Sequence, residues 1–154
     1  MGLPRSFSGI ASIPTSIRFL APVYGLDSTR IGIMGFSAGG HLASSVATHY
    51  DNGNPASLDS VEMKKCRPDF NILVYPVITM IGPYVHTRSR DALFGMSSSP
   101  NSALLDSFSN QLWITSQTPP TFIDHGDVDV KVPIQNSEMF DSSLIRLMAF
   151  RRSS

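Results

Sequence analysis

The sequence predicts an α/β fold, built as a small, mainly parallel sheet of about three strands flanked by helices. Three continuous apolar runs, at residues 30–36, 70–75 and 121–125, are rich in β-branched and aromatic residues, which is typical of strands covered on both faces. Segments with the apolar spacing of amphipathic helices lie before, between and after these runs. Because strands alternate with helices along the chain, parallel pairing through right-handed crossovers is favoured.

Length and composition agree with one globular domain over residues 1–154. Apolar residues make up 42% of the 154 residues and charged residues 16%, a composition far from that of disordered chains. The 12 basic and 12 acidic side chains give a net charge of zero, so we expect binding neither to nucleic acid nor to an anionic membrane. The single cysteine, Cys66, excludes an internal disulfide and a cysteine-rich zinc site. We expect neither a metal nor a cofactor.

The first two predicted helices flank the first strand. The earlier one has an apolar stripe at helical spacing, formed by Ile13, Ile17, Leu20 and Tyr24. Pro22 lies inside this stripe and should kink or shorten the last turn, and Gly25 is placed to end the helix. The later helix follows the strand directly and has the stripe Leu42, Val46 and Tyr50.

Two segments interrupt the alternation before a last predicted helix over about residues 134–148. Residues 51–69 are polar and contain Asn52-Gly53-Asn54-Pro55, which predicts a surface loop. Residues 76–120 are longer than an ordinary connection and contain one predicted short helix, capped at Ser99 and Pro100. Long connections at the carboxyl end of a sheet are often functional, so we expect this segment to cover a pocket.

The strongest functional signal is the segment Gly35-Phe36-Ser37-Ala38-Gly39, a G-x-S-x-G motif between a predicted strand and a predicted helix. A sharp turn there lifts the serine oxygen clear of the sheet, and small residues at 35 and 39 should let neighbouring backbone pass closely. Ser37 then lies at a helix N-terminus, where free backbone N–H groups favour negative charge. The motif predicts Ser37 as a nucleophile and the Ala38 N–H as one donor to the oxyanion.

An acidic turn follows the third predicted strand, within residues 125–133. Both Ser37 and this turn fall at the carboxyl ends of strands, where parallel sheets bind their ligands. Asp129 is the preferred carboxylate to orient a catalytic base, and Asp127 is the second candidate. The alternative for either aspartate is a turn-capping role, which aspartates fill in many proteins.

Several motifs in order resemble the α/β-hydrolase family, in the esterase/lipase branch near bacterial acetylxylan-esterase-like and carboxylesterase-like proteins. They lie at residues 31–43, 67–70, 73–78 and 118–122, and the resemblance covers about residues 16–145. The resemblance implies a partial α/β-hydrolase fold in which Ser37 matches the nucleophile, Ala38 one arm of the oxyanion hole and Asp129 the triad acid. It also implies that the segment around His86, Ser89 and Arg90 lies over the pocket, and that short acyl esters, including acetylated sugars, are substrates.

The chain departs from the family pattern near both ends, as expected for a domain truncated at both. No glycine-rich loop precedes the nucleophile strand to supply a second oxyanion N–H, and no histidine follows Asp129 to act as the base. His86, in the covering segment, is the candidate surrogate base. We expect His41 to pack in the interior. His49 should lie exposed at a helix C-terminus, and His125 should hold the acidic turn by hydrogen bonding.

These features predict a serine carboxylic-ester hydrolase that acts through Ser37. The alternative is a catalytically impaired hydrolase fragment that binds a ligand or a partner chain. Unpaired strand edges predict a homo-oligomer formed through a sheet edge or exposed helix faces. Prolines and a glycine interrupt the longest apolar stretch, residues 70–85, so no membrane span is expected. With no signal-peptide pattern at the N-terminus, a cytoplasmic location is the expectation.

Overall fold

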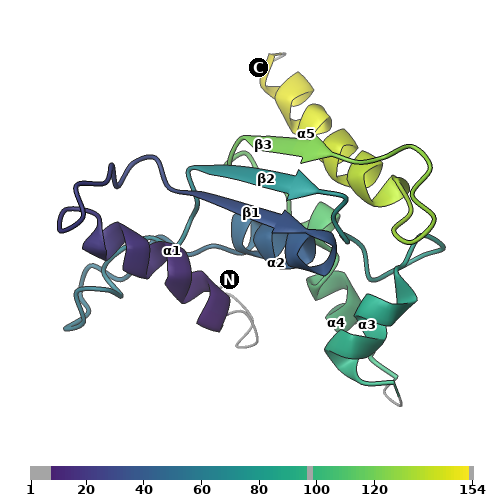
Figure 1. Cartoon of the computed structure of the whole chain (residues 1–154), viewed down its shortest axis with the longest axis horizontal. Coiled ribbons are helices and arrows are strands. Elements are labelled where there is room, and N and C mark those ends of the chain that lie inside the picture. Colours follow the sequence, from purple (N-terminus) through teal and green to yellow (C-terminus); the bar gives the residue numbers. More distant parts are fainter. Residues whose placement is uncertain (1–7, 97–98, 153–154) are drawn as a thin grey trace.

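A three-stranded parallel sheet forms the centre of the molecule (Figure 1). The computed structural model describes residues 8–96 and 99–152. The strands are β1 (Gly32–Phe36), β2 (Phe70–Val74) and β3 (Thr121–Asp124), in the spatial order β1-β2-β3. In the register, Gly35 lies opposite Leu73, and Leu73 lies opposite Ile123. The predicted α/β class and all three predicted strands are confirmed.

Five α-helices and a short 3-10 helix surround this sheet in the described part of the chain. They are α1 (Ser8–Leu20), α2 (Ser37–Thr48), α3 (Thr87–Phe94), α4 (Ser102–Ser107), η2 (Asn110–Leu112) and α5 (Gln135–Arg152). α1 stops before Pro22, which agrees with the expected shortening of its last turn. α5 starts one residue later than about residue 134 and continues past residue 148.

The segment over residues 76–120 contains two α-helices where the sequence predicted one. α3 was not predicted, because none of its side chains is buried and it therefore lacks an apolar stripe. The second helix, α4, is capped by Asn101 rather than by Ser99 or Pro100. The Asn101 carboxamide oxygen accepts a hydrogen bond of 2.9 Å from the Leu104 N–H.

The core lies on one side of the sheet, between the strands, α2 and α5. Ala43, Leu73, Ile78 and Phe140 form its centre and are almost completely buried. On the opposite face, where alternate strand residues point, Met34 and Phe122 are more than half exposed. The expectation that helices cover both faces is therefore wrong for residues 8–96 and 99–152. An apolar run shows that a strand is hydrophobic, but it does not show what covers each side.

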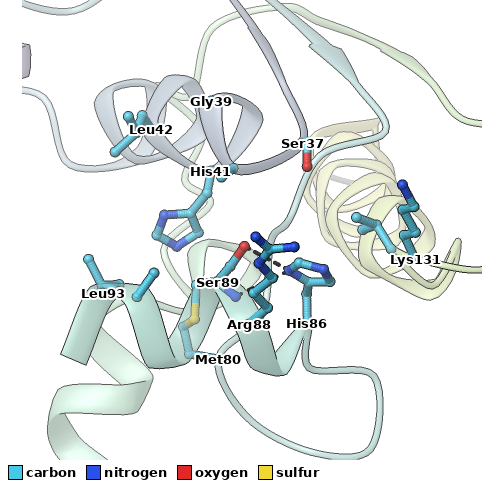
Figure 2. A pocket seen from close by; sticks show the side chains of 13 residues that line it. Ser37, Gly39, His41, Leu42, Met80, His86, Arg88, Ser89, Leu93 and Lys131 are labelled. Carbon is cyan, nitrogen blue, oxygen red and sulfur yellow. Dashed lines mark hydrogen bonds between the residues drawn. The ribbon is translucent and has the colours of Figure 1, made fainter. Parts of the chain in front are cut away.

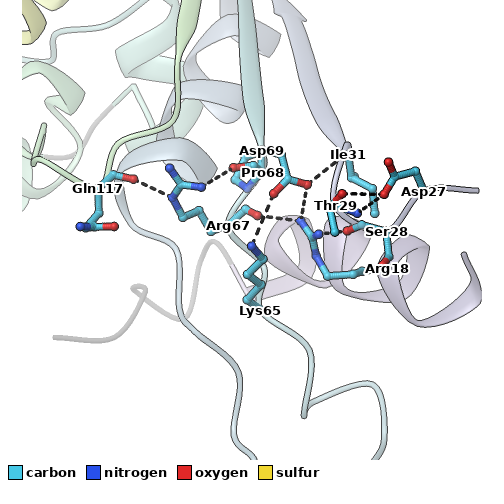
Figure 3. Close-up of polar contacts among 10 residues, drawn as sticks. All are labelled: Arg18, Asp27, Ser28, Thr29, Ile31, Lys65, Arg67, Pro68, Asp69 and Gln117. Carbon is cyan, nitrogen blue, oxygen red and sulfur yellow. Dashed lines mark hydrogen bonds and ion pairs between the residues drawn. The ribbon is translucent and has the colours of Figure 1, made fainter.

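A polar cluster joins α1 to the sheet at the start of β1 and β2 (Figure 3). The buried Arg18 guanidinium donates to the Asp69 carboxylate at 3.1 Å, to the Arg67 carbonyl at 2.9 Å and to the Ser28 carbonyl. The same Asp69 oxygen accepts from the Ile31 N–H at 2.9 Å. Although burial opposes ionisation, the Ile31 N–H and the Arg18 charge keep the pKa of Asp69 below its ordinary value.

No helix within the described ranges is both long and apolar enough to cross a membrane.

Candidate functional site

Ser37 lies at a strained turn between β1 and α2. Phe36, the last residue of β1, is extended, with φ −115° and ψ 140°. Ser37 then has φ +51°, a left-handed conformation that a residue with a Cβ adopts at a cost of about 1–3 kcal/mol. The turn ends the strand and starts the helix within one residue. It leaves the half-buried Ser37 at the first position of α2.

Glycines next to this turn allow a close approach of backbone. A Cβ on Gly35 would lie 2.1 Å from the Gly39 carbonyl oxygen. A Cβ on Gly40 would lie 2.7 Å from the Cβ of Pro76, in the segment that follows β2. By contrast, nothing lies within 4 Å of the position a Cβ would take on Gly39. The expectation that positions 35 and 39 both need a small side chain is therefore correct for 35 and wrong for 39. Gly40 is the second residue that packing restricts.

The segment after β2 holds the backbone of the turn. The Val77 N–H donates to the Ser37 carbonyl oxygen at 3.0 Å, and the Tyr75 N–H donates to the Asp124 carbonyl at 2.7 Å. Tyr75 also has a positive φ, of +36°. Two strained non-glycine residues thus lie at the carboxyl ends of adjacent strands, which is where strain collects at functional sites.

A cavity of about 580 Å³ opens beside Ser37 (Figure 2). Its walls come from the start of α2, from α3 and the residue before it, from the segment after β2 and from the turn after β3. The lining residues are Ser37, Ala38, Gly39, His41, Leu42, Met80, His86, Arg88, Ser89, Ala92, Leu93, Lys131 and Val132. This volume suits a small organic ligand, and apolar side chains make much of the surface.

The first turn of α2 presents backbone N–H groups at this cavity. Ala38 and Gly39 line it directly, and Phe36, the cap residue, makes no side-chain hydrogen bond to the helix start. The first N–H groups of a helix have no partner within the helix, and they carry its positive dipole end. A negative charge on a ligand bound at this end of α2 would therefore be stabilised.

Asp129 lies in the turn after β3, next to the cavity. One carboxylate oxygen accepts from the Lys131 N–H at 2.8 Å and from the Val132 N–H at 3.0 Å, and Lys131 and Val132 both line the cavity. These two backbone bonds lower the pKa of Asp129. Asp129 therefore caps this turn, which is the alternative role that the sequence left open for it. The other carboxylate oxygen is 3.7 Å from the His125 Nε2, and Asp127 lies exposed in the same turn.

His41, His49 and His125 make contacts that hold the fold together. His125 bonds through Nδ1 to Ser137 at 2.7 Å and through Nε2 to the Val132 carbonyl at 3.0 Å, so it holds the acidic turn as expected. His41 is buried as expected. It bonds to the Phe108 carbonyl at 2.8 Å, and burial lowers its pKa. The expectation of an exposed His49 is wrong, because its ring packs 5.0 Å from that of Trp113 and partial burial lowers its pKa.

His86 lines the same cavity as Ser37 (Figure 2). It caps α3: its Nδ1 accepts from the Ser89 N–H at 3.3 Å and lies 2.7 Å from the Ser89 hydroxyl. No hydrogen bond joins His86 to Ser37. The structure therefore brings Ser37, Ala38 and His86 to one cavity and places Asp129 behind its wall.

Two cationic residues at the cavity, Arg88 and Lys131, were missed by sequence reasoning. The resemblance implied that Arg90 lies over the pocket, but Arg90 lines a different cavity with Asp91, and Arg88 lines this one. Recognising α3 would have separated the two arginines, because residues two apart do not share a helix face. Among the described residues, no three His, Cys, Asp or Glu side chains are grouped so that they could hold a metal ion.

Comparison with known proteins identifies relatives of this chain. The model of the BD-FAE family matches residues 8–144. A solved acetyl ester-xyloside bifunctional hydrolase from Caldicellulosiruptor lactoaceticus is 38% identical and superposes with a TM-score of 0.88. An acetylxylan esterase of Xylanibacter ruminicola is 34% identical over 119 residues, and an endo-1,4-beta-xylanase B of Butyrivibrio fibrisolvens is 35% identical over 147 residues.

These matches cover most of this chain but only part of each relative. The match to the Caldicellulosiruptor structure covers 95% of this chain and 53% of that one. The Xylanibacter match covers 77% of this chain and the Butyrivibrio match 94%, and each covers 22% of the relative. The chain thus spans about half the length of the related solved structure.

Proposed function

This chain belongs to the BD-FAE family of α/β-hydrolase esterases, and we propose that it hydrolyses short acyl esters, including acetyl esters of sugars, through Ser37. The observation that carries this proposal is the left-handed Ser37 at the start of α2, facing a cavity of ligand size. The acetylxylan esterase relative supports acetylated sugars as the substrate class.

In the proposed reaction, the Ser37 oxygen attacks the ester carbonyl carbon, and the hydroxyl proton passes to a base. The Ala38 N–H stabilises the oxyanion that forms. The acyl group stays on Ser37 while the alcohol leaves with a proton, and water then releases the acid. Asp129, whose backbone bonds lower its pKa, is the carboxylate that would orient a base supplied from outside the described residues, because within them it lies beside His125 and not beside His86.

His86 is the proposed base on this chain. Because Nδ1 accepts from the Ser89 N–H, the neutral ring carries its proton on Nε2, and Nδ1 is the nitrogen that can take a proton. To take the serine proton, the His86 ring must therefore release Ser89 and turn Nδ1 toward Ser37. We propose further that residues 1–154 form a single domain in which residues 76–120 cover the pocket. The contribution of α3 to the cavity lining supports this role.

A second candidate function is binding of a ligand or partner chain without turnover. It is favoured by the contacts of Asp129 and of its nearest histidine, His125. Asp129 is 3.7 Å from His125, and His125 is itself held by Ser137 and Val132. Neither residue then activates Ser37, and loss of the triad histidine costs subtilisin about six orders of magnitude in turnover.

The decisive experiment compares the wild type with Ser37→Ala for hydrolysis of p-nitrophenyl acetate and for labelling by a fluorophosphonate. We expect both signals in the wild type and neither in Ser37→Ala. Ser102→Ala, on the exposed first turn of α4, is the matched control and should behave like the wild type. Rates and labelling that do not depend on Ser37 would exclude the esterase function and leave the binding function.

A second variant tests the base. His86→Asn keeps a side chain that can cap α3 but cannot take a proton at neutral pH. If His86 is the base, the Ser37-dependent rate falls in His86→Asn while thermal stability stays close to that of the wild type. An unchanged rate would show that the base is another group.

A further inference from the structure

We propose that the cavity beside Ser37 selects esters whose alcohol portion carries a carboxylate. This inference rests on the proposed esterase function. Two cationic side chains, Arg88 and Lys131, line the cavity together with Ser37. Of the residues described at this cavity, none is acidic. A cavity that holds two positive charges and no negative one favours an anionic ligand over a neutral one of the same shape.

Arg88 has its charge available for a ligand. It lies in the first turn of α3, is exposed, and makes no ion pair with a described residue. Figure 2 shows its guanidinium extending from α3 toward the Ser37 side of the cavity. Asp91, the acidic residue of the same helix, lines the neighbouring cavity with Arg90.

Lys131 reaches the cavity from the turn after β3, across from Arg88 in Figure 2. Lys131 is exposed and forms no ion pair with the described residues. Asp129, in the same turn, partly offsets this charge. However, one oxygen of Asp129 is already occupied by two backbone N–H groups, and Asp129 does not line the cavity.

The location of the charge on the substrate follows from the chemistry of the ester. A short acyl group such as acetyl has no ionisable atom, so the negative charge must be on the alcohol portion. The planar guanidinium of Arg88 matches the two oxygens of a carboxylate. The start of α2, beside Ser37, adds positive potential in the same cavity. Apolar side chains such as Leu42 and Leu93 are left to contact the uncharged part of the ligand.

Two acetyl esters of similar shape test this selection: 4-acetoxybenzoate, which is anionic, and 4-acetoxybenzamide, which is neutral. The measured quantity is the ratio of kcat/KM for the anionic ester to that for the neutral ester. In Arg88→Gln this ratio should fall about two- to fivefold relative to the wild type, the range expected for an exposed charge pair. Comparing ratios between variants cancels the intrinsic reactivity of the two esters. Sodium chloride at about 0.5 M should lower the wild-type ratio toward that of the variant.

Arg90→Gln is the matched control. It removes the same charge from the same helix but at a residue that lines the neighbouring cavity, so the ratio should stay at the wild-type value. An equal fall in both variants would mean that the charge of the whole helix matters, and it would overturn the assignment to Arg88. A ratio that is unchanged in Arg88→Gln would also overturn it.

A binding measurement separates this inference from the esterase function. NMR titrations of the full chain with 4-hydroxybenzoate, 4-hydroxybenzamide and inorganic phosphate need no turnover. Stronger binding of 4-hydroxybenzoate than of the amide, weakened in Arg88→Gln and not in Arg90→Gln, supports the inference even if no ester is hydrolysed. Equal binding of acid and amide overturns it. Preferential binding of phosphate over the benzoate overturns the choice of a carboxylate.

Discussion

Alanine substitutions at the two glycines of the G-x-S-x-G motif should have opposite effects on stability. Both substitutions add one methyl group to the turn that carries Ser37. At Gly35 that methyl would lie 2.1 Å from the Gly39 carbonyl oxygen and 2.5 Å from the Gly39 carbonyl carbon. At Gly39 it would meet nothing within 4 Å. The same chemical change therefore enters occupied space at one position and open space at the other.

The size of each effect follows from these contacts. Ordinary van der Waals contact begins near 3.4 Å, so with alanine at 35 the start of α2 must move by more than about 1 Å. The opposing atoms are backbone, which cannot rotate away as a side chain can. We therefore expect a loss of about 3 kcal/mol, the upper end of the range for overpacking. Gly39→Ala lies inside a helix and should stabilise the protein by about 0.5–1 kcal/mol.

Urea unfolding followed by circular dichroism measures the free energy of unfolding of the two variants and of the wild type. Fluorophosphonate labelling measures whether Ser37 keeps its position, and it should slow in Gly35→Ala and persist in Gly39→Ala. A Gly39→Ala protein as unstable as Gly35→Ala would refute the reasoning, because nothing in the structure opposes a methyl at 39. A stable and fully labelled Gly35→Ala would refute it as well.

Three further outcomes are expected. Arg18→Met should lower the free energy of unfolding, measured in urea, by about 3–5 kcal/mol, because it leaves the Asp69 charge without its buried partner. Lys65→Met removes only a half-exposed partner of the same carboxylate and should lower it by less than about 1 kcal/mol. Equal losses would contradict this. Burial raises the pKa of the Cys66 thiol to about 11. At pH near 8, iodoacetamide should therefore alkylate Cys66 slowly until the protein unfolds. Fast alkylation of Cys66 in the native protein would contradict this. We expect a second copy of the chain to cover the exposed apolar sheet face or a strand edge, because a chain with a net charge of zero does not strongly repel its copies. Phe122→Ser should then reduce the self-association measured by light scattering. A sharp wild-type monomer peak at micromolar concentration would count against this.

The strands and the turn at Ser37 could be predicted from the sequence because their signals are local. A continuous run of β-branched and aromatic residues of strand length indicates a strand, whatever covers its faces. The motif around Ser37 combines a strand, a serine between glycines and a helix in sequence order, so no long-range contact is needed to recognise it. The motif did not show which small residues packing requires, because Gly40 is restricted by Pro76, which lies beyond β2.

Features that depend on tertiary packing could not be predicted. α3 has no buried side chain, so no apolar periodicity marked it, and Arg88 could not be assigned to the cavity without that helix. The exposure of Phe122 also could not be predicted, because the apolar run that contains it suggested that helices cover both faces of the sheet. The described chain covers the sheet on one face only and leaves this ring 64% exposed.

The position of Ser37 depends on residues about a hundred positions later in the chain. Its left-handed backbone is unfavourable alone and is held by the hydrogen bond from the Val77 N–H. The residues after Val77 are fixed in turn by the buried Asn136 of α5, whose carboxamide oxygen accepts from the Ile78 N–H at 2.9 Å and the Thr79 N–H at 3.1 Å. Because buried amides left without these acceptors would each cost about 1–3 kcal/mol, this arrangement resists relaxation. The motif thus supplies the serine, and the packing of α5 against the segment after β2 maintains the strain that presents it.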